Sequence, residues 1–297
     1  MSALNRFETP SDKAFNVVLV VLLSLLTVIV LYPIWYCIVA SFSDPTKVLN
    51  GEIWLLPKGW NLEGYTNVFE NARIWTGYRN SIVYTLVAVA INLTMTVLAA
   101  YPLSRSDLKG RGPLMLIAVF TMFFSGGLIP QYLIVKALHI DNSMWAVVLP
   151  TALNTYNLIV MRTFFQSSIP GELYEASHMD GASNTRILFS VVLPLSTPIL
   201  AVMFLFYSVE NWNSYFNAMI YLSDKKLQTL PLVLREIIIQ SSAQDMTGTD
   251  PNATQRMMQA ESIKYASIIL ASLPMLILYP FIQKFFVQGV MIGAVKG

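Results

Sequence analysis

The chain has 297 residues, of which 55% are hydrophobic and only 12% are charged, and its mean hydropathy is +0.56. Soluble domains carry about 25% charged residues, so this composition excludes an ordinary soluble protein and indicates a polytopic membrane protein. The net charge of +2 argues against nucleic acid as a partner, and the single cysteine excludes a disulfide framework or a cysteine-based metal site.

The first apolar run covers residues 14–41. It is longer than the core of a signal peptide, which has about 7–15 residues, and long enough to cross a hydrocarbon layer of about 30 Å. We expect an uncleaved first span, kinked at Pro33. Residues 44–77 are polar and rich in Trp and Tyr, which favour the membrane interface, so they are predicted to form an external loop.

The second span is predicted over residues 80–103. Arg105, Lys109 and Arg111 follow it in a short loop. Basic residues in short loops favour the cytoplasmic side, so this loop is predicted to lie in the cytoplasm.

The third span is predicted over residues 114–135, where Gly126, Gly127 and Pro130 interrupt the second half. Broken backbone at membrane depth is tolerated where protein or a water-filled cavity covers it. Two interpretations stay open: a helix break beside a transport pathway, or fraying at the outer end of the span.

The later spans are predicted over residues 144–162, 187–209 and 265–286, with a long external segment at 210–264 and a tail at 287–297. Six spans with both chain ends in the cytoplasm are therefore expected. The fold class is an all-α membrane protein.

Ionisable side chains are almost absent from the interiors of these spans. Ion-coupled transporters place charged groups there, and membrane hydrolases need a nucleophile with a base, paired carboxylates or a metal site. The chain also lacks a phosphate-binding GxxxxGK[ST] loop. A transporter of this kind must take its energy from a separate ATPase, so the chain itself is predicted not to be an enzyme, to hold no metal and to bind no cofactor.

The polar side chains near the spans are uncharged amides and hydroxyls, which suit hydrogen bonds to a neutral, hydroxyl-rich solute, while aromatic rings suit sugar faces. The alternative is ordinary hydrogen bonding between membrane helices. The predicted substrate pathway comprises Asn92, Gln131, Asn154, Asn157, Trp212, Asn213 and Tyr215.

A polar elbow lies between the fourth and fifth spans. Ser168 is in position to cap a helix, Glu172 and Glu175 suit its N-terminal turns, and Gly181 permits a break with positive φ before a new apolar run. Two short helical pieces are therefore predicted to meet at a glycine. Such an elbow without a catalytic set suggests a docking surface; the alternative is an ordinary amphipathic turn.

The residues Glu175-Ala176-Ser177, Asp180-Gly181-Ala182, Leu193-Pro194 and Pro198 resemble the "EAA" loop of ABC importer permeases. The family more often has alanine at the position of Ser177. The resemblance implies a type I importer fold in which residues 169–186 form cytoplasmic coupling helices that sit in a cleft of the ATPase subunit. The coupling residues it implies are Glu172, Leu173, Tyr174, Glu175, Ala176, Ser177, Asp180, Gly181 and Ala182.

Residues 210–216, 221–224 and 229–232 resemble the stretch of maltose-type carbohydrate permeases that dips as an external scoop toward the binding protein, and residues 289–297 resemble their C-terminal tail. The finer resemblance is to permeases for oligosaccharides of the polygalacturonate or alginate type. The implied contacts with the binding protein are Tyr221, Ser223, Asp224, Leu230 and Pro231.

These resemblances imply three parts: residues 1–76 with the first span, a core permease domain at 77–288 with the scoop at 210–264, and a cytoplasmic tail at 289–297. They also imply a bacterial cytoplasmic (inner) membrane location and alternating access driven by two ATPase subunits, which bind ATP and Mg. A second, different permease subunit, an extracytoplasmic solute-binding protein and membrane lipid complete the expected partners. The alternatives are a permease for another solute, such as an amino acid or peptide, and a membrane enzyme or scaffold outside this class.

Overall fold

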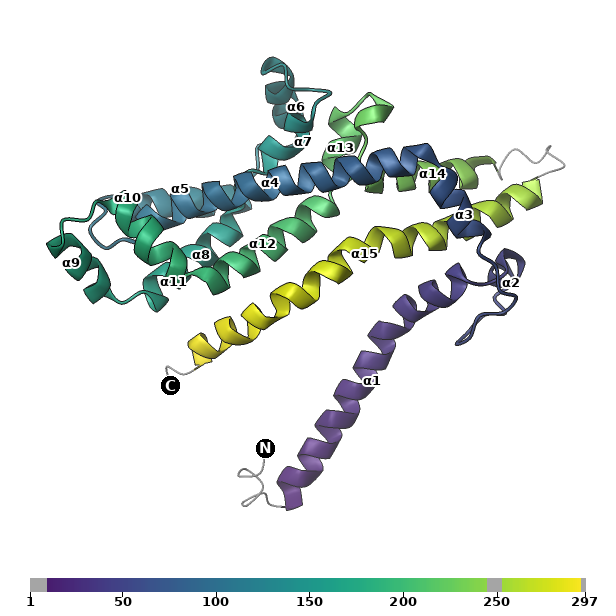
Figure 1. Cartoon of the computed structure of the whole chain (residues 1–297), viewed down its shortest axis with the longest axis horizontal. Helices are drawn as coiled ribbons and strands as arrows, with labels where there is room; N and C mark the ends of the chain where they lie inside the picture. The colour runs from purple at the N-terminus through teal and green to yellow at the C-terminus, as the bar shows by residue number, and fades with distance from the viewer. Residues whose placement is uncertain (1–9, 245–252, 295–297) are drawn as a thin grey trace. The chain divides into compact units, whose positions relative to one another are not determined.

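The computed structural model describes residues 10–244 and 253–294, and within these ranges every regular element is a helix (Figure 1). The helices form two compact units. Unit 1 combines the chain up to Glu70 with Ile237–Leu270, and unit 2 combines Asn71–Glu236 with the chain from Ala271 onward.

Unit 1 begins with α1 (Pro10–Ser41), which contains Pro33 as expected, and continues with α2 (Pro45–Leu49) and α3 (Glu63–Glu70). The last two helices lie where only a loop was predicted. Asp44 starts α2 by accepting a hydrogen bond from the backbone N–H of Thr46 at 2.8 Å, and Pro45 occupies the first helical position.

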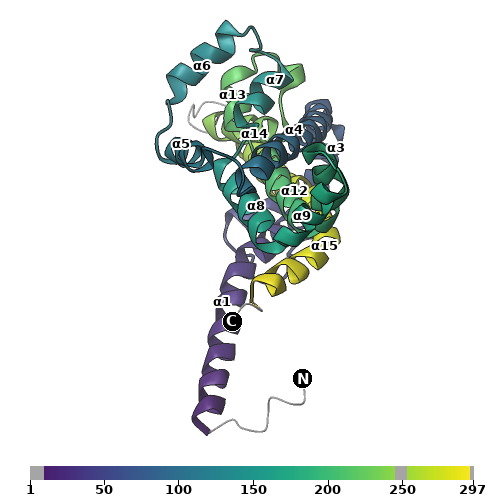
Figure 2. The same ribbon diagram turned by 90° about the vertical axis from the view of Figure 1, so that its left-hand side faces the viewer.

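Unit 2 is organised around α4 (Ala72–Ser104), which packs along α8 (Thr155–Ser168) and α12 (Thr197–Trp212), as Figures 1 and 2 show. The helix begins eight residues before the predicted start at residue 80, because Asn71 accepts a hydrogen bond from the N–H of Arg73 at 3.0 Å and caps it there. The boundary predicted between residues 76 and 77 therefore lies inside α4.

The third predicted span is broken. The helices α5 (Arg111–Phe123) and α6 (Leu128–Ala137) meet at an angle of 110°. Gly127, with φ +87°, forms the break. Of the two open interpretations, the helix break is confirmed, and its place beside a transport pathway stays a prediction. Simple fraying is wrong because a regular ten-residue helix follows the break.

The fourth and fifth predicted spans are also bent. The helix α7 (Met144–Val148) continues as a 3₁₀ turn, η2 (Leu149–Thr151), and meets α8 at 50°. The predicted fourth span ended at residue 162, six residues before the end of α8.

The fifth span is preceded by α10 (Asn184–Ile187), the π-helical turn η3 (Leu188–Val192) and α11 (Leu193–Leu195), which together meet α12 at 82°. The fifth span predicted over residues 187–209 is therefore a bent pair of helical segments and not one straight helix. The chain turns at Ser196, between Pro194 and Pro198, and proline favours the first turn of a new helix over the interior of an old one.

The chain then forms α13 (Phe216–Tyr221), the 3₁₀ turn η4 (Lys225–Leu227), α14 (Leu230–Gln244) and α15 (Ala253–Ala294). The last helix begins well before the predicted start at residue 265. The part of the predicted scoop at 245–252 and the final tail residues 295–297 lie outside the described residues.

By length and composition, the described residues contain three helices able to cross a membrane alone: Ser11–Ser41, Ala72–Ser104 and Met257–Phe285. Counting each of the three bent pairs as one span gives up to six, the predicted number.

A buried hydrogen-bond chain joins α4 to α12. Thr96 and Tyr207 are each 0% exposed, and their hydroxyl oxygens lie 2.6 Å apart. Because the Thr96 hydroxyl already donates to the carbonyl of Asn92 at 2.6 Å, Tyr207 is the donor to Thr96.

This arrangement predicts an asymmetry between two conservative substitutions. Thr96→Val should destabilise the protein by about 1–3 kcal/mol, because it leaves the buried Tyr207 hydroxyl without a partner. Tyr207→Phe should cost only about 0.5–1.5 kcal/mol, since Thr96 keeps its bond to Asn92. Thermal unfolding of the detergent-solubilised complex measures both, and an equal loss in the two variants would contradict the assignment of donor and acceptor.

Candidate functional site

The elbow between α8 and α12 is built around α9 (Gly171–Met179), which carries Glu172 in its first turn, as expected. Its predicted cap was wrong. Ser168 is the last residue of α8, and Pro170 precedes α9 without a side-chain cap. The helix α8 reaches this far because Gln166 donates to the carbonyl of Ser104 at 3.3 Å, a contact with α4 that local sequence does not show.

The predicted glycine break is confirmed. Gly181 has φ +73°, its N–H donates to the carbonyl of His178, and the N–H of Ala182 donates to the carbonyl of Ser177, each at 3.0 Å. This pair of bonds is the Schellman motif, which ends a helix at a residue in the left-handed conformation. Ser183 then caps α10 by accepting from the N–H of Arg186 at 3.3 Å.

The helix α9 has no buried residue. Leu173 is 38% exposed and Met179 is 88% exposed. Isolated helices shorter than about 12–15 residues are marginal in water, so a nine-residue helix with this little burial depends on side-chain contacts at its edge or on a partner. Of the nine predicted coupling residues, six are exposed and Tyr174, Ser177 and Ala182 are half-buried.

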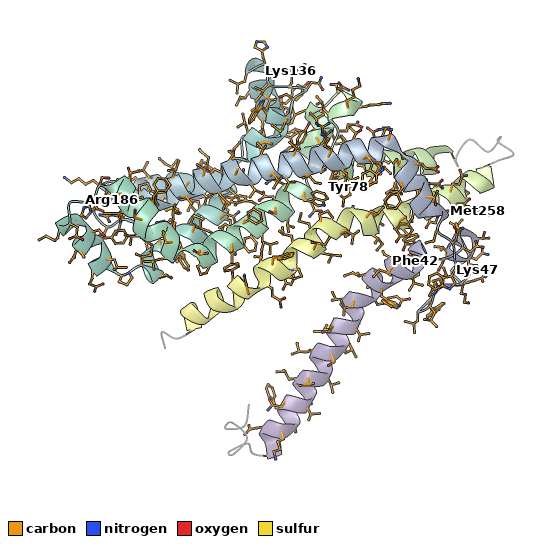
Figure 3. The ribbon with its side chains drawn as sticks, viewed as in Figure 1. Phe42, Lys47, Tyr78, Lys136, Arg186 and Met258 are labelled. Atoms are coloured by element: carbon orange, nitrogen blue, oxygen red, sulfur yellow. The ribbon has the colours of Figure 1, made fainter. Side chains whose placement is uncertain are left out.

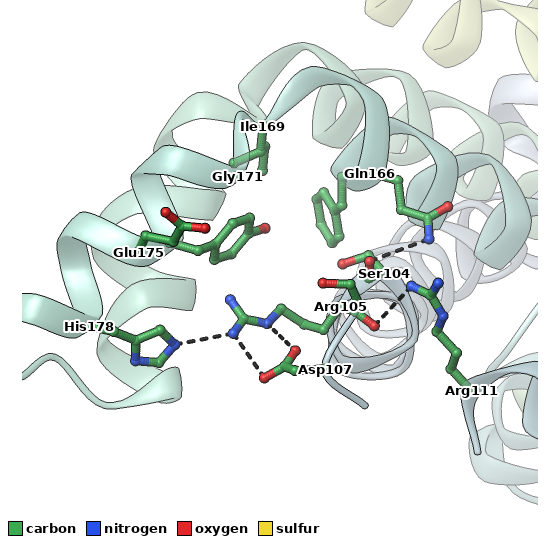
Figure 4. Close-up of a pocket in the computed structure, with 12 residues that line it drawn as sticks. Ser104, Arg105, Asp107, Arg111, Gln166, Ile169, Gly171, Glu175 and His178 are labelled. Atoms are coloured by element: carbon green, nitrogen blue, oxygen red, sulfur yellow. Dashed lines mark hydrogen bonds and ion pairs between the residues drawn. The ribbon is translucent and has the colours of Figure 1, made fainter. Parts of the chain in front are cut away.

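Beside α9 lies a hollow of about 540 Å³, drawn in Figure 4, which is also bordered by the loop between α4 and α5 and by the end of α8. Arg105 extends across it with only 13% of its side chain exposed. It donates two hydrogen bonds to Asp107, at 2.9 and 3.1 Å, and a third to Nε2 of His178 at 3.1 Å. Its guanidinium carbon lies 4.4 Å from the centre of the Tyr174 ring, a cation–π distance.

Electrostatics in this hollow follow from these contacts. The hydrogen bond to Asp107 raises the pKa of Arg105 above its ordinary value, and the same bond lowers the pKa of Asp107. Burial raises the pKa of the Tyr174 phenol. The Nη1 nitrogen of Arg105 is buried and has no hydrogen-bond partner among the described residues. Arg105 is a member of this site that sequence reasoning counted only as one basic residue of a loop.

The predicted pathway residues are not gathered in one place. Asn92 and Asn157 are 0% and 3% exposed, inside the helix packing. Asn154 caps α8 and lies 3.4 Å from a carboxylate oxygen of Glu210. Gln131 is separate from these and lines a second hollow of about 640 Å³ beside the break between α5 and α6.

The three predicted pathway residues at the end of α12 and just after it differ in exposure. Trp212 is 4% exposed and donates its indole N–H to the carbonyl of Ala271 at 3.0 Å. Asn213 donates to the carbonyl of Val209 at 2.9 Å, and Tyr215 is 42% exposed. The second hollow includes Phe216 and Asn217, two residues that the pathway prediction omitted although they adjoin its last segment.

Among the predicted binding-protein contacts, Tyr221 and Leu230 are buried, Pro231 is half-buried, and Ser223 and Asp224 are exposed. The exposed turn is held by Asn142, whose side-chain oxygen accepts from the N–H groups of Ser223 and Asp224 at 3.0 and 2.9 Å. This turn and α9 belong to opposite ends of α4. Figure 3 labels Arg186, which lies in α10 next to α9, and Lys136, which lies in α6.

The profile of the family described as "Binding-protein-dependent transport system inner membrane component" matches residues 1–292. The chain belongs to this family. It is therefore a multi-pass permease subunit of an ABC importer, working in a complex with other ABC components.

Relatives of this permease include the polygalacturonan/rhamnogalacturonan transport system permease YtcP of Bacillus subtilis, 39% identical over 96% of this chain and 99% of that protein. The melibiose/raffinose/stachyose import permease MelC of the same organism is 28% identical over 82% of this chain and 84% of its own.

Among solved structures, the permease resembles a chain of a bacterial ABC transporter involved in the import of the acidic polysaccharide alginate. The TM-score is 0.83 and the identity 32%, over 95% of this chain and 100% of the other. The type I importer fold predicted from the EAA-like residues is thereby confirmed.

Proposed function

We propose that this permease subunit moves a carbohydrate, in the form of an oligosaccharide, across the bacterial cytoplasmic membrane by alternating access. The similarity to YtcP over nearly the whole of both chains and to a chain of the alginate importer supports this substrate class. Among the described residues, the buried polar side chains are all uncharged Ser, Thr, Asn or Gln. Uncharged amides and hydroxyls suit hydrogen bonds to the hydroxyl groups of a sugar.

The observation that carries the coupling role is the exposed helix α9, closed by the Schellman turn at Gly181. Its sequence matches the EAA motif, and its surface is available to a partner. We assign α9 and α10 to the cytoplasm as coupling helices that fit a cleft in one ATPase subunit, one of two in the complex that bind ATP and Mg. Hydrolysis belongs to those subunits, and this chain converts their closure into a change of access.

The orientation follows from the same assignment. Four basic residues lie near the C-terminal end of α4, which suits the cytoplasmic side: Arg105 and Lys109 in the loop after it, Arg111 at the start of α5 and Arg186 in α10. With six crossings, both chain ends are cytoplasmic and the turn at Ser223 and Asp224 faces the solute-binding protein. A second permease subunit of different sequence completes the translocation pathway, to which Gln131, Phe216 and Asn217 contribute from this chain.

The test uses the whole complex, purified through a tag on the ATPase subunit and reconstituted in lipid with the binding protein. ATP hydrolysis is measured with uronic-acid oligosaccharides, neutral oligosaccharides, amino acids and peptides. We expect co-purification of this chain and a rise in ATP turnover with an oligosaccharide. Stimulation by an amino acid or a peptide and by no carbohydrate would refute the substrate class.

A further inference from the structure

The coupling helix α9 is attached to the rest of unit 2 by very little of its own surface. It has no buried residue, and only short links join it to α8 and α10. A helix held in this way can tilt unless side chains fix its orientation.

The neighbouring ends of α4 and α8 are, by contrast, firmly joined. Arg162 donates to the carbonyl of Leu103 at 2.9 Å, and Gln166 donates to the carbonyl of Ser104 at 3.3 Å. The last carbonyls of a helix have no partner within that helix, so these two side chains from α8 satisfy the end of α4. The two helices therefore form a common base next to α9.

Two side chains connect this base to α9. Tyr174 of α9 packs against the apolar core that α4 and α8 share, and Arg105 supplies the polar contacts. Arg105, the residue directly after α4, contacts Tyr174 through its guanidinium face and His178 through Nη2. Tyr174 and His178 are four residues apart and share one face of α9. Two contacts one turn apart restrain both the position and the tilt of a helix, whereas a single contact leaves it free to pivot.

The geometry of Arg105 is itself fixed. Asp107 holds the guanidinium through two parallel hydrogen bonds, at 2.9 and 3.1 Å, which sets the plane of the group as well as its position. Arginine only donates hydrogen bonds, so the contact with His178 requires an unprotonated Nε2. We call Arg105, Asp107, Tyr174 and His178 the Arg105 clip.

We propose that Arg105 is a positioning residue that ties α9 to the end of α4, so that a displacement of α9 by the ATPase reaches α4 directly. This role rests on the proposed coupling function. It assigns the contact through which a displacement of α9 reaches the packed helices α4, α8 and α12. Two other links are less direct. One runs from α9 through Ile169 and Pro170 to α8, and the other runs through α10, where the Tyr101 hydroxyl of α4 donates to the carbonyl of Asn184 at 3.2 Å. Arginine can donate two parallel hydrogen bonds to Asp107 and stack its planar guanidinium on Tyr174, and lysine can do neither.

The test compares Arg105→Met and Arg105→Lys with Lys109→Met as the matched control. Lys109 is an exposed cation in the same loop, and none of its contacts involves α9 among the described residues. Nitroxide labels on Leu98→Cys in α4 and Met179→Cys in α9, both exposed positions, report the distance between the helices in the intact complex. The background carries Cys37→Ser, which removes the single native cysteine.

We expect Arg105→Met to broaden the distribution of distances between α4 and α9. It should also lower the ratio of substrate-stimulated to basal ATP hydrolysis on the order of tenfold, with the ATPase subunits still co-purifying. Arg105→Lys should recover part of this loss, and Lys109→Met should match the wild type. Arg105→Met and Tyr174→Leu should be non-additive, because each removes the same contact.

Two results would overturn the proposal: an unchanged distance distribution in Arg105→Met, or an equal broadening in Lys109→Met. The proposed function fails in a different way, if the wild-type chain purifies without an ATPase or shows no stimulation by an oligosaccharide. The label distances need no nucleotide, so they test whether Arg105 restrains α9 even where no oligosaccharide stimulates ATP hydrolysis.

Discussion

Replacing Gly181 by valine is expected to abolish substrate-stimulated ATP hydrolysis while the chain still inserts in the membrane. Gly181 has φ +73°, a conformation that costs an ordinary residue about 1–2 kcal/mol and a β-branched residue more. The strain falls on the turn that closes α9, so the helix end and the approach of Ala182 to Ser177 are lost together. ATP turnover of the reconstituted complex, with and without substrate, measures the effect.

The surroundings of Gly181 allow strain and partner contact to be separated. No atom of this chain lies within 4 Å of the position that a Cβ would take there. Gly181→Asn tolerates positive φ far better than valine, so it should restore the fold of the turn. If the ATPase cleft closes over this position, Gly181→Asn and Gly181→Asp should still fail to couple, because their side chains fill the space that the cleft needs.

The contradicting outcome is equally specific. Coupling at the wild-type level in Gly181→Asp would remove the elbow from the interface with the ATPase. If Gly181→Asn alone recovered substrate-stimulated ATP hydrolysis, backbone strain would be the only reason why glycine is needed at this position. Co-purification of the ATPase subunits with each variant shows whether binding or transmission is affected.

The second large effect is expected in unit 1, where Gly64→Ala should destabilise the packing of α3 against α15. A Cβ on Gly64 would lie 2.5 Å from both the carbonyl oxygen and the hydroxyl oxygen of Ser262. Backbone cannot yield as a flexible side chain does, so the helices must separate. Overpacking of this kind costs about 1–3 kcal/mol, which should appear as a lower thermal midpoint of the purified complex.

The control for this change is Gly112→Ala in α5, where no atom lies within 4 Å of the added Cβ and φ is not positive. It should be neutral or slightly stabilising, since alanine favours a helix over glycine by about 0.5–1 kcal/mol. An unchanged midpoint for Gly64→Ala would show that α3 and α15 do not keep this close approach.

The elbow was the part of the site most open to prediction, because its signals are local. Glycine at position 181 and the acidic Glu172 each act within one helical turn, and both appear where expected. Ser168 misled for the opposite reason. Its short polar side chain is suited to a cap, but the contact of Gln166 with the carbonyl of Ser104 extends α8 through it.

The role of Arg105 was not predictable from the sequence alone. A basic residue in a short loop indicates topology, and nothing local tells it apart from Lys109 or Arg111. Its partners Tyr174 and His178 come from a helix far along the chain, and only the packing of α4 with α8 brings them near. The bend between α11 and α12 was predictable only in part. Pro194 and Pro198 indicate that the helix breaks there, whereas the angle of 82° is set by packing.

The short loop after α1 shows the reverse case, where a readable signal was overlooked. Asp44 before Pro45 is a typical helix start, and α2 begins there. The aromatic, polar composition of the segment favoured an interfacial loop and concealed a helix of only five residues.

The 110° bend between α5 and α6 at Gly127 has a consequence for the bilayer. The 13 residues of α5 rise about 20 Å, against a hydrocarbon thickness of about 30 Å, and α6, at 110° to α5, adds less to the crossing than a straight continuation would. We therefore expect a hydrophobic mismatch of up to about 10 Å beside α5. Acyl chains there must thin, or a neighbouring polypeptide must displace them, so the lipid annulus around the assembled importer is expected to be uneven in depth.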